Sequence, residues 1–195
     1  RNGPRINWPI YKAVNFIKPK NKSKVLEIGW GCGSTLKKIK SNFGSDVWGV
    51  DTSKKAIEYS RKINKLNNTY VSKFLSFNKN KKFDVVISGG FLYVTPDHQL
   101  KKTIIKMLRL IKKNGFLIIW DYDSPVSYKN KWKYHKKIKA FKRDILKYFF
   151  KFGKKFYLVS KYLVLKDGKK ISSYNKNVNI DNIFSVMIIR KTNVF

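Results

Sequence analysis

Acidic residues and glycines around the first two apolar runs of the chain form a pattern that suits ligand binding. The loop EIGWGCG, residues 27–33, begins within the apolar run 25–28 and is followed by apolar residues at helical spacing. Glycines in such a loop permit a tight turn and let the main chain approach a ligand at the start of a helix. A second acid, Asp51, ends the next apolar run, 18 residues after Gly33. In doubly wound folds an acid in that place accepts hydrogen bonds from ribose hydroxyls, which predicts an adenosine-containing ligand.

The spacing of the glycines separates two classes of adenosine ligand. Dinucleotides require the pattern G-x-G-x-x-G, and Ser34 stands here at the place of its third glycine. The form E-x-G-x-G-x-G instead suits S-adenosylmethionine, which carries a sulfonium and no pyrophosphate, with Glu27 organising the loop and the ligand's charged amino acid end. A glycine loop alone is often a plain turn, and a lone aspartate after a strand is often a helix cap. The combination at this spacing favours a ligand site.

Four segments resemble the class I S-adenosylmethionine-dependent methyltransferases, a Rossmann-like family. They are VLEIGWGCGSTL, VWGVDTSKKAIEYSRK, KFDVVISGGFLYV and LIKKNGFLIIWDYD, and they span residues 24–123, about half of the chain. The resemblance implies a methyltransferase with S-adenosyl-L-methionine as cofactor and S-adenosyl-L-homocysteine as product.

The resemblance also implies which residues hold the cofactor. Glu27 and the loop glycines would face its methionine part, Asp51 its ribose, the stretch 72–74 its adenine, and Ser88 and Gly89 the methyl group. A tryptophan stands in the loop where the family usually has a small residue, which predicts either a changed loop packing or a ring folded over the cofactor. The full predicted set is Glu27, Gly29, Trp30, Gly31, Gly33, Asp51, Thr52, Phe74, Ser88 and Gly89.

Candidates for catalysis are fewer, because methyl transfer from a sulfonium mainly needs an aligned acceptor and, for a hydroxyl, removal of a proton. We predict His135 and Asp121 as the candidate bases. Asp121 and Asp123 follow the apolar run 116–120, whose carboxyl end would face the ligand crevice, and loop capping is the alternative role for both. His98 is expected to be an exposed bystander in the first turn of a helix.

The apolar periodicity predicts the elements that position these residues. Strands are predicted at 25–28, 47–50, 69–75, 83–88, 116–120, 156–165 and 183–191. Helices fall between them, the clearest with Thr95 as N-cap, Pro96 as first residue and Asn114 and Gly115 at its end. The predicted fold class is α/β: a doubly wound, mostly parallel seven-stranded sheet with helices on both faces and an antiparallel C-terminal hairpin.

The chain of 195 residues is long enough for one domain with a real core. We expect a single methyltransferase domain over residues 1–195. Its expected parts are an N-terminal helical segment (1–24), a cofactor-binding core (25–125), a basic-aromatic acceptor insertion (126–155) and closing strands (156–195). The absence of an initiator methionine indicates a start inside a longer chain or after processing.

Composition narrows the setting of the protein. No apolar run approaches the roughly 18 residues that span a bilayer, and the first residues lack the apolar block of a signal peptide. One cysteine and two distant histidines argue against a metal site, and a reducing cytoplasm is predicted. The net charge of +33 comes mostly from lysine, so AT-rich codon bias and a selected basic surface both stay open as explanations.

The sequence says little about which molecule accepts the methyl group. The segment Ser88-Gly89-Gly90-Phe91 lacks the Asn/Asp-Pro-Pro-aromatic motif of many enzymes that methylate nucleobases or amides, and Cys32 lies in the cofactor loop, where it cannot serve a covalent cytosine mechanism. We therefore favour a small-molecule or sugar acceptor, and the charge excess in 126–155 favours an anionic one. The alternative is an RNA-modifying enzyme that contacts phosphate and stacks bases with the same insertion. A degenerate fold without catalysis is a third reading, and the oligomeric state is not predicted.

Overall fold

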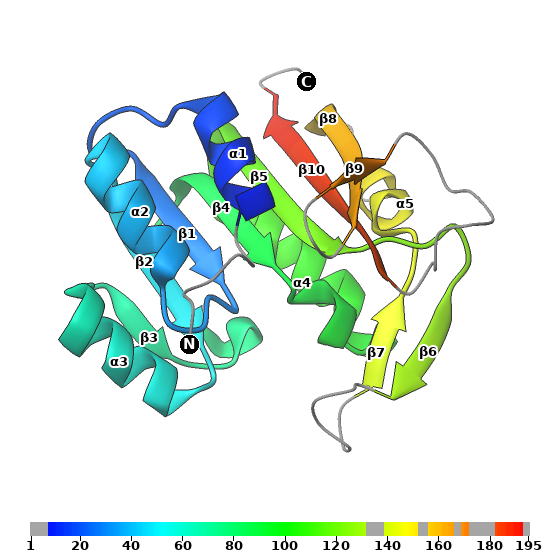
Figure 1. Ribbon diagram of the computed structural model, residues 1–195, viewed down its shortest axis with the longest axis horizontal. Helices are drawn as coiled ribbons and strands as arrows, with labels where there is room; N and C mark the ends of the chain where they lie inside the picture. Colours follow the sequence, from blue (N-terminus) through cyan, green and yellow to red (C-terminus); the bar gives the residue numbers. More distant parts are fainter. Residues whose placement is uncertain (1–7, 132–138, 152–155, 166–168, 172–181, 193–195) are drawn as a thin grey trace.

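The chain alternates strands and helices through its first two thirds and ends in antiparallel strands (Figure 1). The computed structural model describes residues 8–131, 139–151, 156–165, 169–171 and 182–192. The helices are α1 (Trp8–Ile17), α2 (Ser34–Phe43), α3 (Lys54–Asn64), α4 (Asp97–Leu110) and α5 (Ile145–Phe150), with short 3-10 helices at Phe74–Ser76 and Leu92–Val94. The strands are β1 (Lys24–Ile28), β2 (Asp46–Asp51), β3 (Thr69–Val71), β4 (Phe83–Gly89), β5 (Ile111–Tyr122), β6 (Tyr128–Lys131), β7 (Lys139–Lys142), β8 (Phe156–Leu165), β9 (Lys170–Ile171) and β10 (Ile183–Lys191).

The main sheet has eight strands in the order β3-β2-β1-β4-β5-β10-β8-β9. Strands β1 to β5 pair in parallel, and β10 lies antiparallel between β5 and β8. The predicted fold class is therefore confirmed, but the predicted count of seven strands is wrong. The two residues of β9 pair with β8 and add an eighth strand, too short to leave an apolar run in the sequence. Strands β6 and β7 form a separate two-stranded antiparallel sheet within the predicted insertion.

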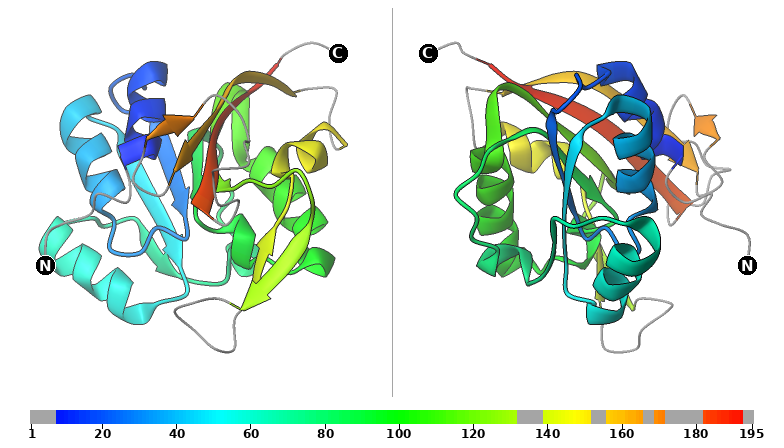
Figure 2. Two further views of the ribbon diagram at one scale, coloured as in Figure 1. Left: turned by 45° about the vertical axis from the view of Figure 1, so that its right-hand side comes forward. Right: turned by 90° about the vertical axis from the view of Figure 1, so that its left-hand side faces the viewer.

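Helices cover both faces of the sheet (Figure 2). Alternate residues of each strand belong to two apolar clusters. Leu26, Val86 and Leu117 pack on the face of α4 and α5, whereas Val25 and Ile118 pack on the face of α1, α2 and α3. Parallel strands buried on both faces require such near-continuous apolar runs, which is why the sequence identified them.

The strand order reverses between β1 and β4, because the chain continues from β1 to β2 on one side and reaches β4 on the other. In open α/β sheets, ligands bind outside the carboxyl ends of the strands at such a switch point. The loop after β1, the end of β2 and the loop after β4 therefore meet at one edge, called here the carboxyl edge.

The prediction for α4 is wrong at both ends. Its N-cap is Pro96 rather than Thr95, and the Thr95 hydroxyl instead donates to the Phe91 carbonyl at 3.1 Å. The helix ends at Leu110, four residues before the predicted stop, because the chain enters β5 at Ile111. Asn114, with φ of 62°, is a left-handed residue near the start of β5.

None of the described helices combines the length and the apolar composition needed to cross a membrane.

Candidate active site

The loop between β1 and α2 is built from three glycines with positive φ. Gly29, Gly31 and Gly33 have φ values of 68°, 58° and 77°, in the left-handed region that side chains disfavour. The amide of Gly29 donates to the Val50 carbonyl at 2.9 Å, which fixes the loop against the end of β2. Gly33 is the N-cap of α2, so the N-terminus of that helix lies directly behind the loop.

The position of the Trp30 ring decides between a changed loop packing and a ring folded over the cofactor. The side chain is buried, with 4% of its surface exposed, inside the apolar cluster on the α2 and α3 face. A Cβ atom on Gly33 would lie 2.0 Å from the ring and one on Gly49 would lie 2.7 Å from it, so both glycines are required by the close approach of the indole. The ring therefore packs into the core beneath the loop rather than folding over the cofactor position.

Asp51 ends β2 at the carboxyl edge and connects the two loops there. One oxygen, Oδ2, accepts from the Gly31 amide at 3.0 Å, and Oδ1 accepts from the Ser53 amide at 2.8 Å. Ser53 in turn caps α3 by accepting from Ala56 at 3.3 Å, while Thr52 is exposed. A carboxylate has about four lone-pair sites, so Asp51 keeps room for ligand hydroxyls beside these two amides.

Glu27 lies on β1 beneath the loop and is 3% exposed. Burial, and after it the nearby charge of Asp51, raise the pKa of Glu27 from 4.5 to about 8, while the Thr35 hydroxyl acts in the opposite direction. Its Oε2 atom is buried without a hydrogen-bond partner among the described residues. Such an atom costs folding free energy unless a ligand or water satisfies it, which points to a binding role.

Ser88 and Gly89 end β4 next to Glu27. The Ser88 hydroxyl is fully buried and has no partner in the described part of the chain. A Cβ atom on Gly89 would lie 2.6 Å from Ile10 Cδ1 of α1 and 4.0 Å from Glu27 Oε1. Ile10 therefore lies over the end of β4, a contact that the sequence did not reveal.

Phe74 lies in the 3-10 helix after β3 and is buried on the opposite face of the sheet from Trp30. Its ring meets Phe91 edge-on, with the ring centroids 5.8 Å apart, and Lys106 lies over the ring at 5.4 Å. The predicted adenine side of the crevice is thus aromatic.

Asp121 is fully buried at the end of β5. Its Oδ2 accepts from the Leu92 amide at 2.7 Å, and its Oδ1 accepts from the amides of Tyr122 at 2.8 Å and Tyr93 at 3.2 Å. Burial raises its pKa to about 7, and these amides, together with the charge of Arg143, oppose the rise. The carboxylate thus orders the loop after β4; its role as a base stays a prediction.

Arg143 fastens the inserted hairpin to that loop, and the sequence reasoning missed it. Its side chain is 2% exposed, and its Nη2 donates to the Thr95 carbonyl at 2.7 Å and lies 3.5 Å from Asp97 Oδ1. Lys129 of β6 pairs with the other oxygen of Asp97 at 3.2 Å. The rarity of arginine, six residues in a lysine-rich chain, was the available signal.

The remaining candidates are dispersed. His98 lies exposed in the first turn of α4, where Gln99 is its contact, and His135 falls outside the described residues. Asp123 is buried and pairs with Lys161 of β8 at 2.7 Å. Tyr93 and Tyr122 meet edge-on at 5.1 Å between ring centroids, and Phe184 stacks on Tyr122 at 4.1 Å, which forms an aromatic group beside the end of β5.

Comparison with known proteins decides the family of the core. Residues 25–115 match the family model of a methyltransferase domain. This stretch, a little under half of the chain, is therefore identified as a methyltransferase domain. The match includes β1, the glycine loop, Asp51, β4 and α4, which are the elements on which the sequence resemblance rested. No curated protein sequence matches the chain.

Solved structures of methyltransferases share the fold. The N-methyltransferase NodS from Bradyrhizobium japonicum, in complex with S-adenosyl-L-homocysteine, is 15% identical with a TM-score of 0.68, over 96% of this chain and 85% of that one. The 1,6-didemethyltoxoflavin-N1-methyltransferase of Burkholderia thailandensis, with bound 1,6-didemethyltoxoflavin and S-adenosylhomocysteine, is 14% identical with a TM-score of 0.74, over 98% and 80%. A putative methyltransferase of Haloferax volcanii, in complex with the Trm112 methyltransferase activator, is 14% identical with a TM-score of 0.73, over 97% and 91%. At these identities the likeness establishes the fold.

Proposed function

We propose that the protein transfers a methyl group from S-adenosyl-L-methionine to a small-molecule acceptor. The observation that carries the proposal is the convergence of the glycine loop, Asp51 and the buried Glu27 at the carboxyl edge, with one Glu27 oxygen unpartnered in the described structure. The methyltransferase match over residues 25–115 supports it, as do the two neighbours that hold S-adenosylhomocysteine.

The residues present suit this cofactor. Glu27 Oε2 would accept a hydrogen bond from the cofactor's ammonium group, whose positive charge would lower the pKa of this carboxyl on binding. Asp51 would accept from the ribose hydroxyls, and Phe74 would border the adenine. Gly31, whose Cβ position has no atom within 4 Å, leaves the main chain open to close approach, and Ser88 and Gly89 would lie by the methyl group. When bound, the cofactor supplies a methyl group already activated by the sulfonium.

The inserted segment 126–155 is the proposed acceptor side. Its described hairpin, β6 and β7, is attached to the loop after β4 through Arg143 and Asp97. Residues of the hairpin that would contact the acceptor are therefore held in a fixed position relative to the proposed methyl group. Asp121 holds that same loop through its amides and acts as a positioning residue in this proposal. His135 remains the proposed base for a hydroxyl acceptor.

A small acceptor is favoured over RNA by the state of the aromatic rings in this region. Lys142 Nζ lies 4.2 Å above the Tyr122 ring and 5.8 Å from the Tyr128 centroid. The covered face of the Tyr122 ring is therefore not open to a stacked base. The Burkholderia enzyme, with its acceptor 1,6-didemethyltoxoflavin bound in the same fold, gives further support.

Calorimetry with S-adenosylmethionine tests the cofactor site. Asp51→Ala should weaken binding about tenfold to a hundredfold, because hydrogen bonds to a charged group are lost. Asp46→Ala is the matched control: Asp46 starts the same strand at the opposite edge and accepts from Asn68 at 2.9 Å. Equal affinity of wild type and Asp51→Ala, with melting temperatures unchanged, would remove the ribose assignment.

A salt titration separates the acceptor classes. An RNA substrate would bind with a steep negative dependence of log affinity on log salt concentration. Weak binding that ignores RNA sequence, together with turnover of a small acceptor, would support the small-molecule assignment.

A further inference from the structure

The edge of the sheet opposite the proposed active site carries a groove of about 300 Å³. It lies where the connection from α1 to β1 passes the starts of β4 and β5. Pro19, Val85 and Phe116 contribute apolar surface to it, and Lys18, Lys20 and Lys113 line it with exposed side chains. We call this feature the amino-edge groove.

The rim of the amino-edge groove is strongly positive. The stretch 18–24 has a lysine at every second position and no acid. Among the described residues that line the groove, Asp84 is the one acid, and it pairs with Lys112 at 2.8 Å while accepting from the Lys24 amide at 2.8 Å. Its charge is therefore already compensated, and Lys18, Lys20, Lys22 and Lys113 are exposed without an acidic partner among the described residues.

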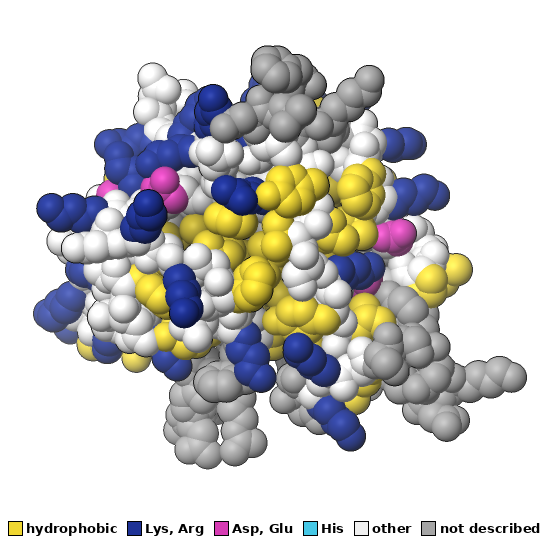
Figure 3. Space-filling view, turned by 90° about the horizontal axis from the view of Figure 1, so that it is seen from above, with side chains coloured by type: hydrophobic (Ala, Val, Ile, Leu, Met, Phe, Trp, Pro, Cys, Tyr) yellow, Lys and Arg dark blue, Asp and Glu magenta, His cyan; other side chains and the backbone are white. Residues whose placement is uncertain are grey.

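Apolar surface extends from the groove along the same edge. Phe116, Arg190 and Tyr157 are register partners on β5, β10 and β8; the Arg190 guanidinium lies 5.3 Å over the Phe116 ring and donates to the Tyr157 hydroxyl at 3.3 Å. Figure 3, which looks onto this edge, shows apolar side chains across its centre with lysine and arginine around them. In the last turn of α1, Phe16 is 65% exposed.

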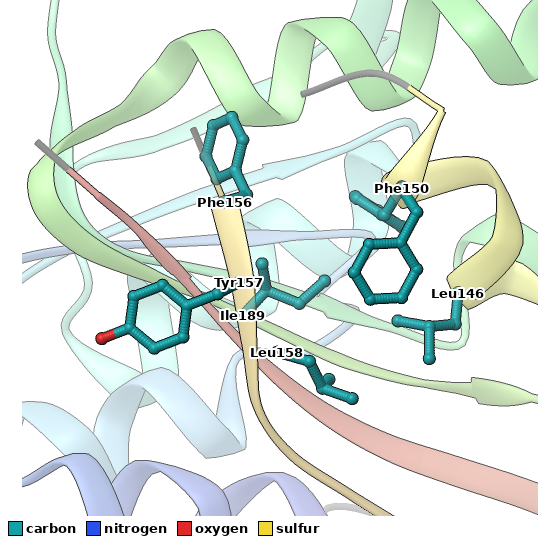
Figure 4. A pocket seen from close by; sticks show the side chains of 7 residues that line it. Leu146, Phe150, Phe156, Tyr157, Leu158 and Ile189 are labelled. Carbon is teal, nitrogen blue, oxygen red and sulfur yellow. The ribbon is translucent and has the colours of Figure 1, made fainter. Parts of the chain in front are cut away.

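On the other face of β8 the edge is apolar as well. Figure 4 shows Phe150 and Leu146 of α5 facing Leu158, while Tyr157 points away from them across the strand. Phe150 is 60% exposed and Tyr157 is 43% exposed. Exposed rings thus lie on both sides of one sheet edge and add apolar surface beside the groove.

The positive charge of the amino-edge groove indicates which kind of partner would bind there. A second copy of this chain would bring its own lysines against the rim, so the partner must be anionic. Sequence-specific recognition of nucleic acid favours arginine, and the one described arginine of this edge, Arg190, is engaged with Phe116 and Tyr157. A bilayer with anionic headgroups satisfies both features, because lysines reach the phosphates while aromatic and aliphatic side chains enter the interface.

We propose that the amino-edge groove and the exposed apolar residues beside it dock the protein onto the surface of a bilayer that contains anionic phospholipids. The carboxyl edge, with the glycine loop and Asp51, then points away from the bilayer. Docking therefore leaves the proposed cofactor crevice accessible from the aqueous side.

Sedimentation with vesicles tests the proposal, using phosphatidylglycerol mixed with phosphatidylcholine against phosphatidylcholine alone. The triple variant Lys18→Gln, Lys20→Gln, Lys22→Gln should partition about a hundredfold more weakly into the anionic vesicles, at roughly fivefold per lysine near the surface. Phe16→Ser should weaken it further by about tenfold with little effect on folding, because that ring is already exposed.

The matched control removes the same charge elsewhere. Lys37, Lys55 and Lys62 are exposed on α2 and α3, and their triple replacement by glutamine should lower binding only severalfold, through net charge. Circular dichroism melts check folding, and the single variant Lys20→Gln, expected to lose fivefold, replaces the triple variant if that one unfolds. Equal losses in the two triple variants, absence of binding to anionic vesicles, or a loss confined to RNA binding would each overturn the proposal.

Discussion

Replacing Glu27 by glutamine should make the protein more stable while weakening cofactor binding. The side chain is 3% exposed, and its ionised form is disfavoured by burial and by the charge of Asp51, so its pKa lies at about 8. Glutamine keeps the shape of the protonated acid and removes the need to take up a proton on folding. Glu27 therefore lowers the stability of the folded protein when no ligand is bound.

The size of the effect depends on pH. A pKa raised from 4.5 to about 8 means that the folded form holds a proton which the unfolded form releases, so this contribution to stability is complete below pH 4.5 and is lost as pH rises toward 8. Over that range the loss amounts to about 5 kcal/mol at most, and to about 3 kcal/mol at pH 7. For a chain of this length, about 3 kcal/mol corresponds to a melting temperature higher by roughly 6–12 °C in the variant.

Urea unfolding of Glu27→Gln and wild type at pH 5, 7 and 9, without cofactor, measures this difference. The two free energies of unfolding should nearly coincide at pH 5 and diverge as pH rises. Asp121, whose pKa is also raised, is present in both proteins and cancels in the comparison. The control Glu58→Gln removes the same charge from an exposed acid that lies 3.9 Å from Lys54, so it measures the effect of losing one negative charge without burial. Parallel curves for Glu27→Gln and wild type across the three pH values would refute the reasoning.

The raised pKa of Glu27 also predicts that protons are released when the cofactor binds. If Glu27 accepts the cofactor's ammonium, its ionised form is favoured on binding, and close to one proton should be released at pH 7. Calorimetry in buffers of different ionisation enthalpy measures the released protons. Glu27→Gln should release none and should bind S-adenosylhomocysteine more weakly.

Two further predictions follow from the packing around the crevice. Gly33→Ala should destabilise the protein by several kcal/mol, because φ at Gly33 is 77° and the added Cβ would meet the Trp30 ring. Gly31→Ala, with open space around it, should cost about 1 kcal/mol. Chemical denaturation measures both losses, and adding Trp30→Ala to Gly33→Ala should recover part of the larger one. Arg143→Met should lower the free energy of unfolding by about 1–3 kcal/mol, because it removes the hydrogen bond to the Thr95 carbonyl. Amide hydrogen exchange should become faster in β6 and β7 and stay unchanged in β1. Unaltered exchange in β6 and β7 would contradict the conclusion that Arg143 attaches the hairpin to the core.

The fold was predictable because its evidence is local. Each parallel strand is buried on both faces, so the runs 25–28, 83–88 and 116–120 appear as continuous apolar segments, and Gly44 ends α2 where the pattern stops. The start of α4 was missed because the Thr95 hydroxyl bonds to Phe91, an alternative that a capping pattern does not reveal. The strand β9 was missed because two residues leave no period.

The site was predictable only in part. Main-chain requirements such as the three left-handed glycines are visible as glycines, and Asp51 is visible because it ends an apolar run. The direction of a side chain is not visible in the sequence: Trp30 could have faced the ligand, and its burial beside Gly33 and Gly49 shows that it faces the core. Long-range partners such as Ile10 over Gly89 lie far apart in sequence and carry no pattern.

The charge of the inserted segment changes meaning once its partners are known. Its excess of lysine and arginine favoured an anionic acceptor, yet Arg143 and Lys129 meet at Asp97, and Lys142 lies over the rings of Tyr122 and Tyr128. These cations hold the hairpin against the core, so the charge count of 126–155 overstates what is available to a ligand. The lysines of 18–24 have no such acidic partners in the described structure and surround apolar surface, which favours the amino edge as a place for an anionic contact.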